Sequence, residues 1–245
     1  MAAIDKVKII VVGDSGVGKT SLTHLICQQQ PIGNPSWTIG CSVEVKLHEY
    51  KEGTPNQRRY FVELWDVGGS QSHKNTRSVF YNPTNVIANV CHSQLGIILV
   101  HDLTNRKSQQ NLQKWLEEVL SKDGTSSRSK SFEDFDPEKF VGSTQIPILV
   151  IGTKLDLISG SNFVKSNIHR RSATIAEECG ADEIFLDCRQ IRSLAAGSSS
   201  SVKLSRFFDK VIERRYYSSR EAFSPDKRRP PLHTSSLYSK FYHND

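Results

Sequence analysis

The chain has 245 residues, of which 37% are hydrophobic. This is enough to bury the core of one α/β domain with insertions or a tail, but not enough for two full domains. No stretch approaches the roughly 20 apolar residues that span a bilayer, and residues 1–6 lack the apolar segment of a signal peptide. The five cysteines form no C-x-x-C pair, which argues against a disulfide framework or a zinc site. We therefore expect a cytoplasmic protein.

The formal net charge is +6. Its excess lies late in the chain, in Arg214, Arg215, Arg220, Lys227, Arg228 and Arg229. Basic segments can bind nucleic acid or anionic lipid, but the chain has no aromatic-interleaved RNA motif and no Cys/His finger, so we expect no nucleic-acid partner. Residues 218–245 are predicted to be a disordered basic tail that contacts anionic lipid only weakly. The folded domain would then comprise residues 1–217.

The first predicted element is a strand containing Val7 and residues 9–12, a run typical of a parallel strand buried on both faces. Residues 13–20 follow and fit G-x-x-x-x-G-K-[ST] at every fixed position. Glycines let backbone N–H groups converge on phosphate oxygens at a helix N-terminus. Lys19 can reach the β- and γ-phosphates, and Thr20 can ligate Mg²⁺. With a helix predicted over residues 21–27, this motif indicates a phosphate-binding loop.

A hairpin is predicted next. Residues 41–50 alternate apolar and polar side chains, as an edge strand does, and the apolar ones are Cys41, Val43, Val45 and Leu47. Residues 53–56 supply turn chemistry, and residues 60–65 return as the second arm.

Later elements alternate between strand and helix patterns. Residues 96–100 and 146–151 are continuous β-branched runs, as in central strands. Residues 105–120 and 201–217 have helical spacing, and the second places one apolar stripe on Leu204, Phe207, Phe208, Val211 and Ile212. The alternation predicts an open α/β fold, with a mostly parallel sheet covered by helices. Residues 123–144 are rich in Ser, Lys and acidic residues and are predicted to form a surface insertion.

Three further motifs distinguish between nucleotides. Asp66 ends a predicted strand, where its carboxylate can hold the Mg²⁺ shell, and the backbone of Gly69 can sense a γ-phosphate. Thr38 lies on the loop before the edge strand. Asp156 follows the strand over residues 148–151, where its carboxylate can accept both N–H groups of a guanine edge in a way that adenine cannot match. These residues favour a guanine nucleotide.

With these motifs the chain resembles the Ras superfamily of small GTPases, and its Rab branch most closely, over about residues 5–217. The matching motifs occur in family order: Gly-Asp-Ser-Gly-Val-Gly-Lys-Thr at 13–20, Thr-Ile-Gly at 38–40, Trp-Asp-x-x-Gly from 65, Leu-Val-His-Asp-Leu-Thr at 99–104 and Thr-Lys-x-Asp at 153–156. Residues 34–38, 65–70 and 194–199 are similar to the Rab-like protein three group. The resemblance implies a small-GTPase P-loop fold, with a mostly parallel six-stranded sheet, one antiparallel edge strand and helices on both faces.

The resemblance also implies the cofactors and their ligands. GTP or GDP would bind with Mg²⁺, and the metal would be held by Thr20, Thr38 and, through water, Asp66. The implied nucleotide contacts are Ser15, Gly16, Val17, Gly18, Lys19, Thr20, Ser21, Thr38, Gly69, Lys154, Leu155 and Asp156, with Asp187 and Cys188 in the late loop over the base. The family has Ser-Ala where this chain has Asp187-Cys188.

Four departures from the family change what is expected. Ser70 stands where the family has the glutamine that orients the attacking water, and Gln71 lies one position late, so no residue is assigned as catalytic and GTP hydrolysis is expected to be slow. Thr153 replaces an asparagine and Pro31 an aromatic residue, which predicts weaker base binding and faster exchange. The last cysteine is Cys188, so no C-terminal prenyl anchor is expected. Residues 86–95 are predicted to be an insertion where the family has a short connection.

The sequence leaves three functions open. The chain can be a nucleotide-dependent switch that hydrolyses GTP slowly, a GTP-binding scaffold or adaptor with negligible turnover, or an ATPase of the same loop class. Ser70 favours the second. The resemblance further implies protein partners, namely other small GTPases and the chaperone that handles them, a role in regulating prenylation and signalling of those GTPases, and homodimer formation.

Overall fold

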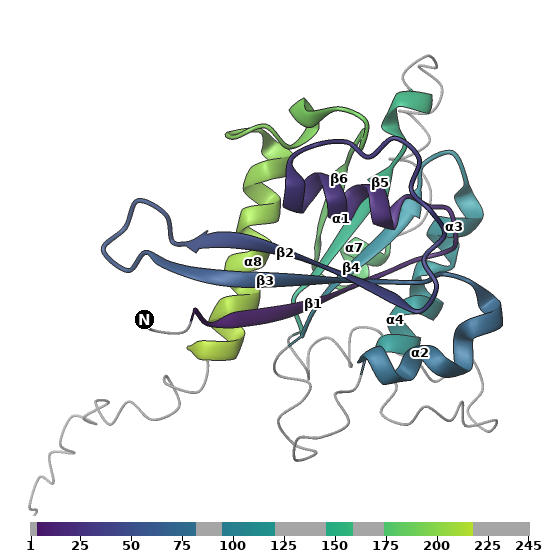
Figure 1. Cartoon of the computed structure of the whole chain (residues 1–245), viewed down its shortest axis with the longest axis horizontal. Coiled ribbons are helices and arrows are strands. Elements are labelled where there is room, and N and C mark those ends of the chain that lie inside the picture. Colours follow the sequence, from purple (N-terminus) through teal and green to yellow (C-terminus); the bar gives the residue numbers. More distant parts are fainter. Residues whose placement is uncertain (1–3, 82–94, 121–145, 159–173, 218–245) are drawn as a thin grey trace, which may run out of the picture.

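The computed structural model describes residues 4–81, 95–120, 146–158 and 174–217. In these residues one sheet of order β2-β3-β1-β4-β5-β6 crosses the molecule (Figure 1). Its strands are β1 (Lys6–Val12), β2 (Cys41–Tyr50), β3 (Arg58–Val67), β4 (Leu95–Asp102), β5 (Ile148–Thr153) and β6 (Asp182–Phe185). Only the β2 and β3 pair is antiparallel. The predicted mostly parallel, six-stranded sheet with one antiparallel edge strand is confirmed.

The sheet separates two apolar clusters because side chains alternate along each strand. In β1, Ile9 and Val11 join α1 (Lys19–Gln28) and α8 (Ser199–Tyr216) on one face. Ile10 and Val12 join α2 (Lys74–Tyr81), α4 (Leu112–Leu120) and α7 (Ile175–Glu178) on the other face. The predicted stripe of α8 is buried against the first face. Helices therefore pack on both faces of the parallel part of the sheet, as such a sheet requires.

The predicted helix over residues 105–120 is not continuous. It divides at Asn111 into α3 (Arg106–Gln110) and α4. The Asn111 side chain donates a hydrogen bond of 2.8 Å to Asp14 in the phosphate loop, so a tertiary contact accompanies the break. The sequence patterns did not predict α2, α7 or β6. Of these, α7 and β6 have only four residues each, too few for a periodic pattern of side chains to be recognised.

The edge strand β2 has the predicted bounds, but its apolar face points outward. Val43, Val45 and Leu47 are 45%, 48% and 47% exposed. The polar face packs inward, where His48 is buried and its Nε2 lies 2.8 Å from an Asp209 carboxylate oxygen on α8. The molecule consequently presents an uncovered apolar strip beside the loop that carries Thr38.

Several predictions fall on residues that the structure does not describe. The insertion at 123–144 and the tail at 218–245 lie outside the described residues. So does most of the insertion at 86–95, although Leu95 itself begins β4. Tyr217 follows α8 and is the last described residue. Cys27, Cys41, Cys179 and Cys188 carry free thiols, and within the described ranges no helix is long and apolar enough to cross a membrane.

Candidate functional site

The phosphate loop lies between β1 and α1, at the edge of the sheet where the parallel strands end. Gly13 has a φ of 152°, and a Cβ there would stand 2.1 Å from the Val100 carbonyl oxygen, so the position requires glycine. Lys19 is buried, and its Nζ donates to the carbonyl oxygens of Gly13 and Asp14 at 2.9 and 2.8 Å. Burial lowers the pKa of Lys19 to about 8, against the opposing charges of Asp66 and Asp14. The loop thus holds a desolvated ammonium group ready for an anion.

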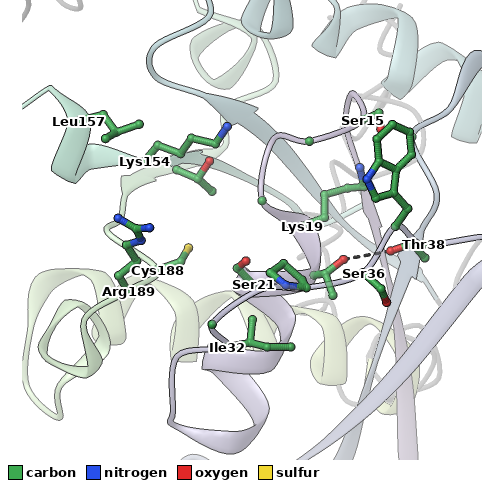
Figure 2. Close-up of a pocket in the computed structure, with 18 of the residues that line it drawn as sticks. Ser15, Lys19, Ser21, Ile32, Ser36, Thr38, Lys154, Leu157, Cys188 and Arg189 are labelled. Atoms are coloured by element: carbon green, nitrogen blue, oxygen red, sulfur yellow. Dashed lines mark hydrogen bonds between the residues drawn. The ribbon is translucent and has the colours of Figure 1, made fainter.

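A cavity of about 740 Å³ opens beside this loop. Its size is within the range of roughly 300–1,000 Å³ that is typical of small-molecule sites. The predicted site residues that line it are Ser15, Gly16, Gly18, Lys19, Thr20, Ser21, Thr38, Gly69, Lys154, Asp156 and Cys188. Figure 2 shows Lys154, Leu157, Cys188 and Arg189 at one end and Ser15, Lys19 and Thr38 at the other. One cavity therefore joins the phosphate loop to the loops that follow β5 and β6.

Three predicted metal ligands converge at the phosphate end. The Thr20 and Thr38 hydroxyls donate to Asp66 Oδ2 at 2.6 and 3.1 Å, and the two hydroxyl oxygens lie 3.0 Å apart. Asp66 is 1% exposed, and its Oδ1 is buried without a hydrogen-bond partner. Burial raises the pKa of Asp66, although Thr20, Lys19 and Thr38 oppose the shift. A buried carboxylate that holds two hydroxyls on one oxygen and has no partner for the other fits a hard divalent cation such as Mg²⁺.

Two loops close over this cluster. The Gly68 N–H donates to the Gly40 carbonyl at 2.9 Å. A Cβ on Gly69 would stand 2.5 Å from the Ser15 backbone nitrogen, so the backbone there lies directly on the phosphate loop. Glycine at 69 permits this close approach of the two backbones.

Ser70 lines the cavity, but its hydroxyl has a local role. Its Oγ accepts a hydrogen bond of 3.3 Å from the Ser72 N–H, which caps the short helix η1 (Gln71–His73). Gln71 is exposed and does not line the cavity. The Ser70 hydroxyl therefore has a partner within its own turn.

The opposite end of the cavity is built by the loops after β5 and β6. Lys154 adopts a left-handed conformation with φ 60°, and its Nζ donates to Asp102 Oδ2 at 2.7 Å. The Leu155 N–H donates to the Leu186 carbonyl at 3.2 Å, which ties the two loops together. Asp156 Oδ2 lies 3.7 Å from the exposed Arg189 guanidinium. Asp156 keeps its carboxylate at the cavity.

Val17, Leu155 and Asp187, together with the predicted metal-site residue Asp66, do not line the cavity. The Val17 carbonyl accepts a short hydrogen bond from the buried Thr153 hydroxyl, so Thr153 anchors the phosphate loop. The Asp187 carboxylate accepts from the Arg189 N–H at 2.8 Å and shapes the late loop. Burial raises the pKa of the Cys188 thiol to about 12, so it stays protonated at neutral pH.

The cavity also contains residues that sequence reasoning did not select. They are Ile32, Gly33, Pro35, Ser36, Trp37, Ser70, Thr153, Leu157 and Arg189. Ser70 and Thr153 were noticed only as departures from a family pattern. Arg189 directly follows Cys188 and could have been found by extending the late loop by one residue. Ile32 and Leu157 are apolar residues in loops, and no motif marks them.

Comparison with known proteins identifies the family. The family model described as Ras of Complex, Roc, domain of DAPkinase matches residues 8–129. Rab-like protein 3 of Xenopus tropicalis is 56% identical over 221 residues, with 88% of each chain covered. Rab-like protein 3 of Homo sapiens is 54% identical over 222 residues, with 89% of each covered. The chain belongs to the Rab-like small GTPases. A more distant relative, the Small GTPase LIP1 of Arabidopsis thaliana, is 34% identical over 236 residues, which cover 87% of this chain and 64% of that protein.

Membership makes this Rab-like small GTPase a GTP-binding regulator. The family model spans the phosphate loop, Thr38 and Asp66 but ends before Lys154 and Asp156. The Rab-like protein 3 relatives cover nearly nine tenths of the chain. The identification therefore draws on more of the chain than the phosphate-binding half.

Proposed function

We propose that the chain binds GTP or GDP together with Mg²⁺ in the 740 Å³ cavity and acts on protein partners as a nucleotide-dependent regulator. The observation that carries this proposal is the distribution of chemistry within one cavity. Lys19, Thr20 and Thr38 line one end, and the Thr20 and Thr38 hydroxyls donate to Asp66, which is buried and does not itself line the cavity. Asp156 stands at the other end. A nucleoside phosphate needs a cationic, metal-binding end and a base-reading end, and this arrangement supplies both.

At the phosphate end, the backbone of residues 15–21 would bind phosphate oxygens at the N-terminus of α1. Lys19 would exchange the two loop carbonyls for phosphate oxygens, which restores a charge partner to its buried ammonium group. Thr20 and Thr38 would hold Mg²⁺, with Asp66 reaching it through water. When bound, Mg²⁺ would supply positive charge against the phosphates, and the Gly69 N–H would be available to contact the terminal phosphate.

At the base end, Asp156 would accept the N1–H and the exocyclic amino group of guanine. The ion pair with Asp102 holds Lys154 beside the cavity, where its aliphatic stem can cover the base. Leu155 and Asp187 would hold the surrounding loops in place without contacting the base through their side chains. Cys188 would do the same, but it also lines the cavity. Base selection then depends mainly on Asp156.

Replacement of Asp156 by Asn tests the base assignment. An amide cannot accept both guanine N–H groups, but it can donate to the oxygen that xanthine carries in place of the amino group. We expect GTP affinity to fall by at least about 100-fold and xanthosine triphosphate to become the better ligand. A ligand that leaves buried polar groups without hydrogen-bond partners binds much more weakly than one that pairs them. Competition binding measures both. The assignment would be contradicted if the variant folds but its affinities for GTP and for xanthosine triphosphate fall equally.

We further propose that hydrolysis of GTP to GDP and phosphate is slow. A water-orienting group must lie within hydrogen-bond reach of the attacking water, and the Ser70 hydroxyl is short and already accepts from the Ser72 N–H. This observation also favours the second candidate function, a GTP-binding scaffold or adaptor with negligible turnover. The slow switch and the scaffold differ in their rate of GTP hydrolysis but use the same binding site, so both predict the same nucleotide complex.

Single-turnover phosphate release from GTP separates the two candidates. We expect Ser70→Gln to raise the rate by at least about tenfold, because a positioned water-orienting group contributes on the order of 10² or more. Ser72→Gln serves as the control, since it adds the same side chain two positions away. If Ser70→Gln and the wild type release phosphate at the same rate, the role given to position 70 is wrong.

Protein partners are proposed to bind the outward apolar strip, which we define as Trp37, Ile39, Val43, Val45, Leu47 and Phe61. Trp37 and Ile39 are 86% and 83% exposed and flank Thr38, so nucleotide and metal contacts at Thr38 would reshape the strip. Contiguous exposed apolar patches mark interaction sites. We propose three occupants of this surface: the chaperone of small GTPases, other small GTPases whose prenylation and signalling it regulates, and a second copy of the chain.

We also propose a cytoplasmic location, with which the free thiols of the described cysteines accord.

Val45→Lys tests the strip with a matched control. Val45 and Val202 are 48% and 47% exposed, but Val202 lies on α8 away from the strip. We expect Val45→Lys to weaken self-association and chaperone co-purification by about tenfold, which corresponds to roughly 1.4 kcal/mol, and Val202→Lys to leave both unchanged. Analytical ultracentrifugation and pull-down measure the two effects. If the two variants have equal effects, the strip is not the interaction surface. Deletion of residues 218–245 separately tests how much the tail contributes to self-association and chaperone binding.

A further inference from the structure

Arg77 on α2 has no part in the site assigned above, yet it is the largest fully buried side chain in the described residues, with 1% exposed. Burying an unpaired guanidinium would be strongly unfavourable, so a buried arginine needs several partners of good geometry. The partners of Arg77 come from the loop over residues 68–70 and from a helix outside the site.

The helix partner is Glu118 on α4, which lies next to α2 (Figure 1). Arg77 Nε and Nη2 donate to the two carboxylate oxygens of Glu118 at 2.8 and 2.9 Å. Tyr81 adds a hydroxyl donor to Glu118 Oε1 at 2.9 Å. Bidentate pairing fixes the direction of the guanidinium as well as its charge. The Arg77 side chain is therefore held from the α4 side.

The remaining nitrogen of Arg77 points to the loop. Nη1 donates to the Ser70 carbonyl at 2.7 Å and lies 3.4 Å from the Gly68 carbonyl. Between these two carbonyls is Gly69, whose backbone lies against Ser15 of the phosphate loop. Arg77 thus bonds the loop on both sides of the residue proposed to contact the terminal phosphate.

The same helix reaches the phosphate loop by a second route. The Arg77 guanidinium lies 4.4 Å from the centroid of the Trp115 ring. Trp115 Nε1 donates to Asp14 Oδ1 at 2.8 Å, and Asn111 Nδ2 donates to Asp14 Oδ2 at 2.8 Å. The α4 helix and the adjoining Asn111 therefore connect the phosphate loop to the arginine that holds the Gly68–Ser70 backbone.

We propose that Arg77 is a positioning residue that keeps the loop over residues 68–70 closed on the phosphate loop before any γ-phosphate arrives. The proposal rests on the proposed nucleotide function and concerns how that site is regulated. Here the protein itself provides the contacts that order the loop. A GTP-bound complex then gains the Gly69 contact without first ordering the loop, whereas a GDP-bound complex keeps a closed loop that it does not use.

This arrangement has a measurable consequence. A ligand that uses only the closed loop binds in proportion to the closed fraction of the protein. Loss of the Arg77 contacts lowers that fraction, so affinity for a GTP analogue falls while affinity for GDP does not. A merely structural role for Arg77 would lower both affinities together, because general loosening affects the whole site.

The experiment compares the wild-type full chain with a variant that removes the buried pair without leaving a lone charge. Arg77→Met, Glu118→Leu and Tyr81→Phe are combined, because replacing a buried ion pair by apolar residues of similar size is often neutral for stability. Arg77→Lys is the second variant, since it keeps the charge but loses the fork. Lys114→Met, at an exposed position of α4, is the control. Affinities for GDP and a non-hydrolysable GTP analogue are measured with amide hydrogen exchange of residues 68–73.

We expect the combined variant to lose about tenfold in affinity for the GTP analogue, a typical coupling between sites, with GDP affinity unchanged. We expect its residues 68–73 to exchange faster in the nucleotide-free and GDP states, Arg77→Lys to be intermediate and Lys114→Met to match the wild type. An unchanged ratio of the two affinities, or unchanged exchange in the nucleotide-free chain, would overturn the proposal. If no guanine nucleotide binds, the proposed function fails, and the nucleotide-free exchange still decides whether Arg77 holds the loop.

Discussion

The carboxylate of Asp66 is buried where β3, the start of α1 and the loop before β2 meet, and the geometry of the site depends on it. Its Oδ2 accepts from Thr20 at the start of α1 and from Thr38 on the loop before β2. Because Asp66 lies on β3 beside Val11 of β1, the parallel pairing of these strands fixes the distance between the carboxylate and the phosphate loop. A buried carboxylate with one unpartnered oxygen is unfavourable by itself, and a bound cation would remove that penalty. A metal bound there would be linked to the fold through this side chain.

The rest of the cavity follows from the same strand arrangement. Strands β1, β3, β4, β5 and β6 run parallel, so their carboxyl ends and following loops gather at one edge, where open α/β sheets bind ligands. Asp102 after β4 orients Lys154 after β5, and Thr153 fastens the phosphate loop to the end of β5. The two ends of the cavity are therefore held by neighbouring strands of one sheet, and the proposed phosphate and base contacts would share that support.

The sequence predicted the parts of this structure that depend on local chemistry. The phosphate loop, the buried β1 and the edge position of β2 could be read from residue type and spacing, because glycine geometry and strand periodicity are short-range properties. Strand periodicity separates two faces but cannot say which face is covered, so the outward apolar side of β2 became visible only in the fold. Arg77 could not be recognised either, since its burial depends on Glu118, which is 41 positions away. The Asn111 break has the same origin in a contact with Asp14.

The central claim is that one cavity holds a guanine nucleotide with Mg²⁺, and competition for a fluorescent GDP derivative tests it most directly. GDP and GTP should displace the probe at a stoichiometry near one per chain, ADP and ATP should not, and removal of Mg²⁺ by a chelator should accelerate probe release. Displacement by adenine nucleotides as readily as by guanine nucleotides, or probe binding that is indifferent to Mg²⁺ removal, would contradict the roles given to Asp156 and to the Thr20, Thr38 and Asp66 cluster.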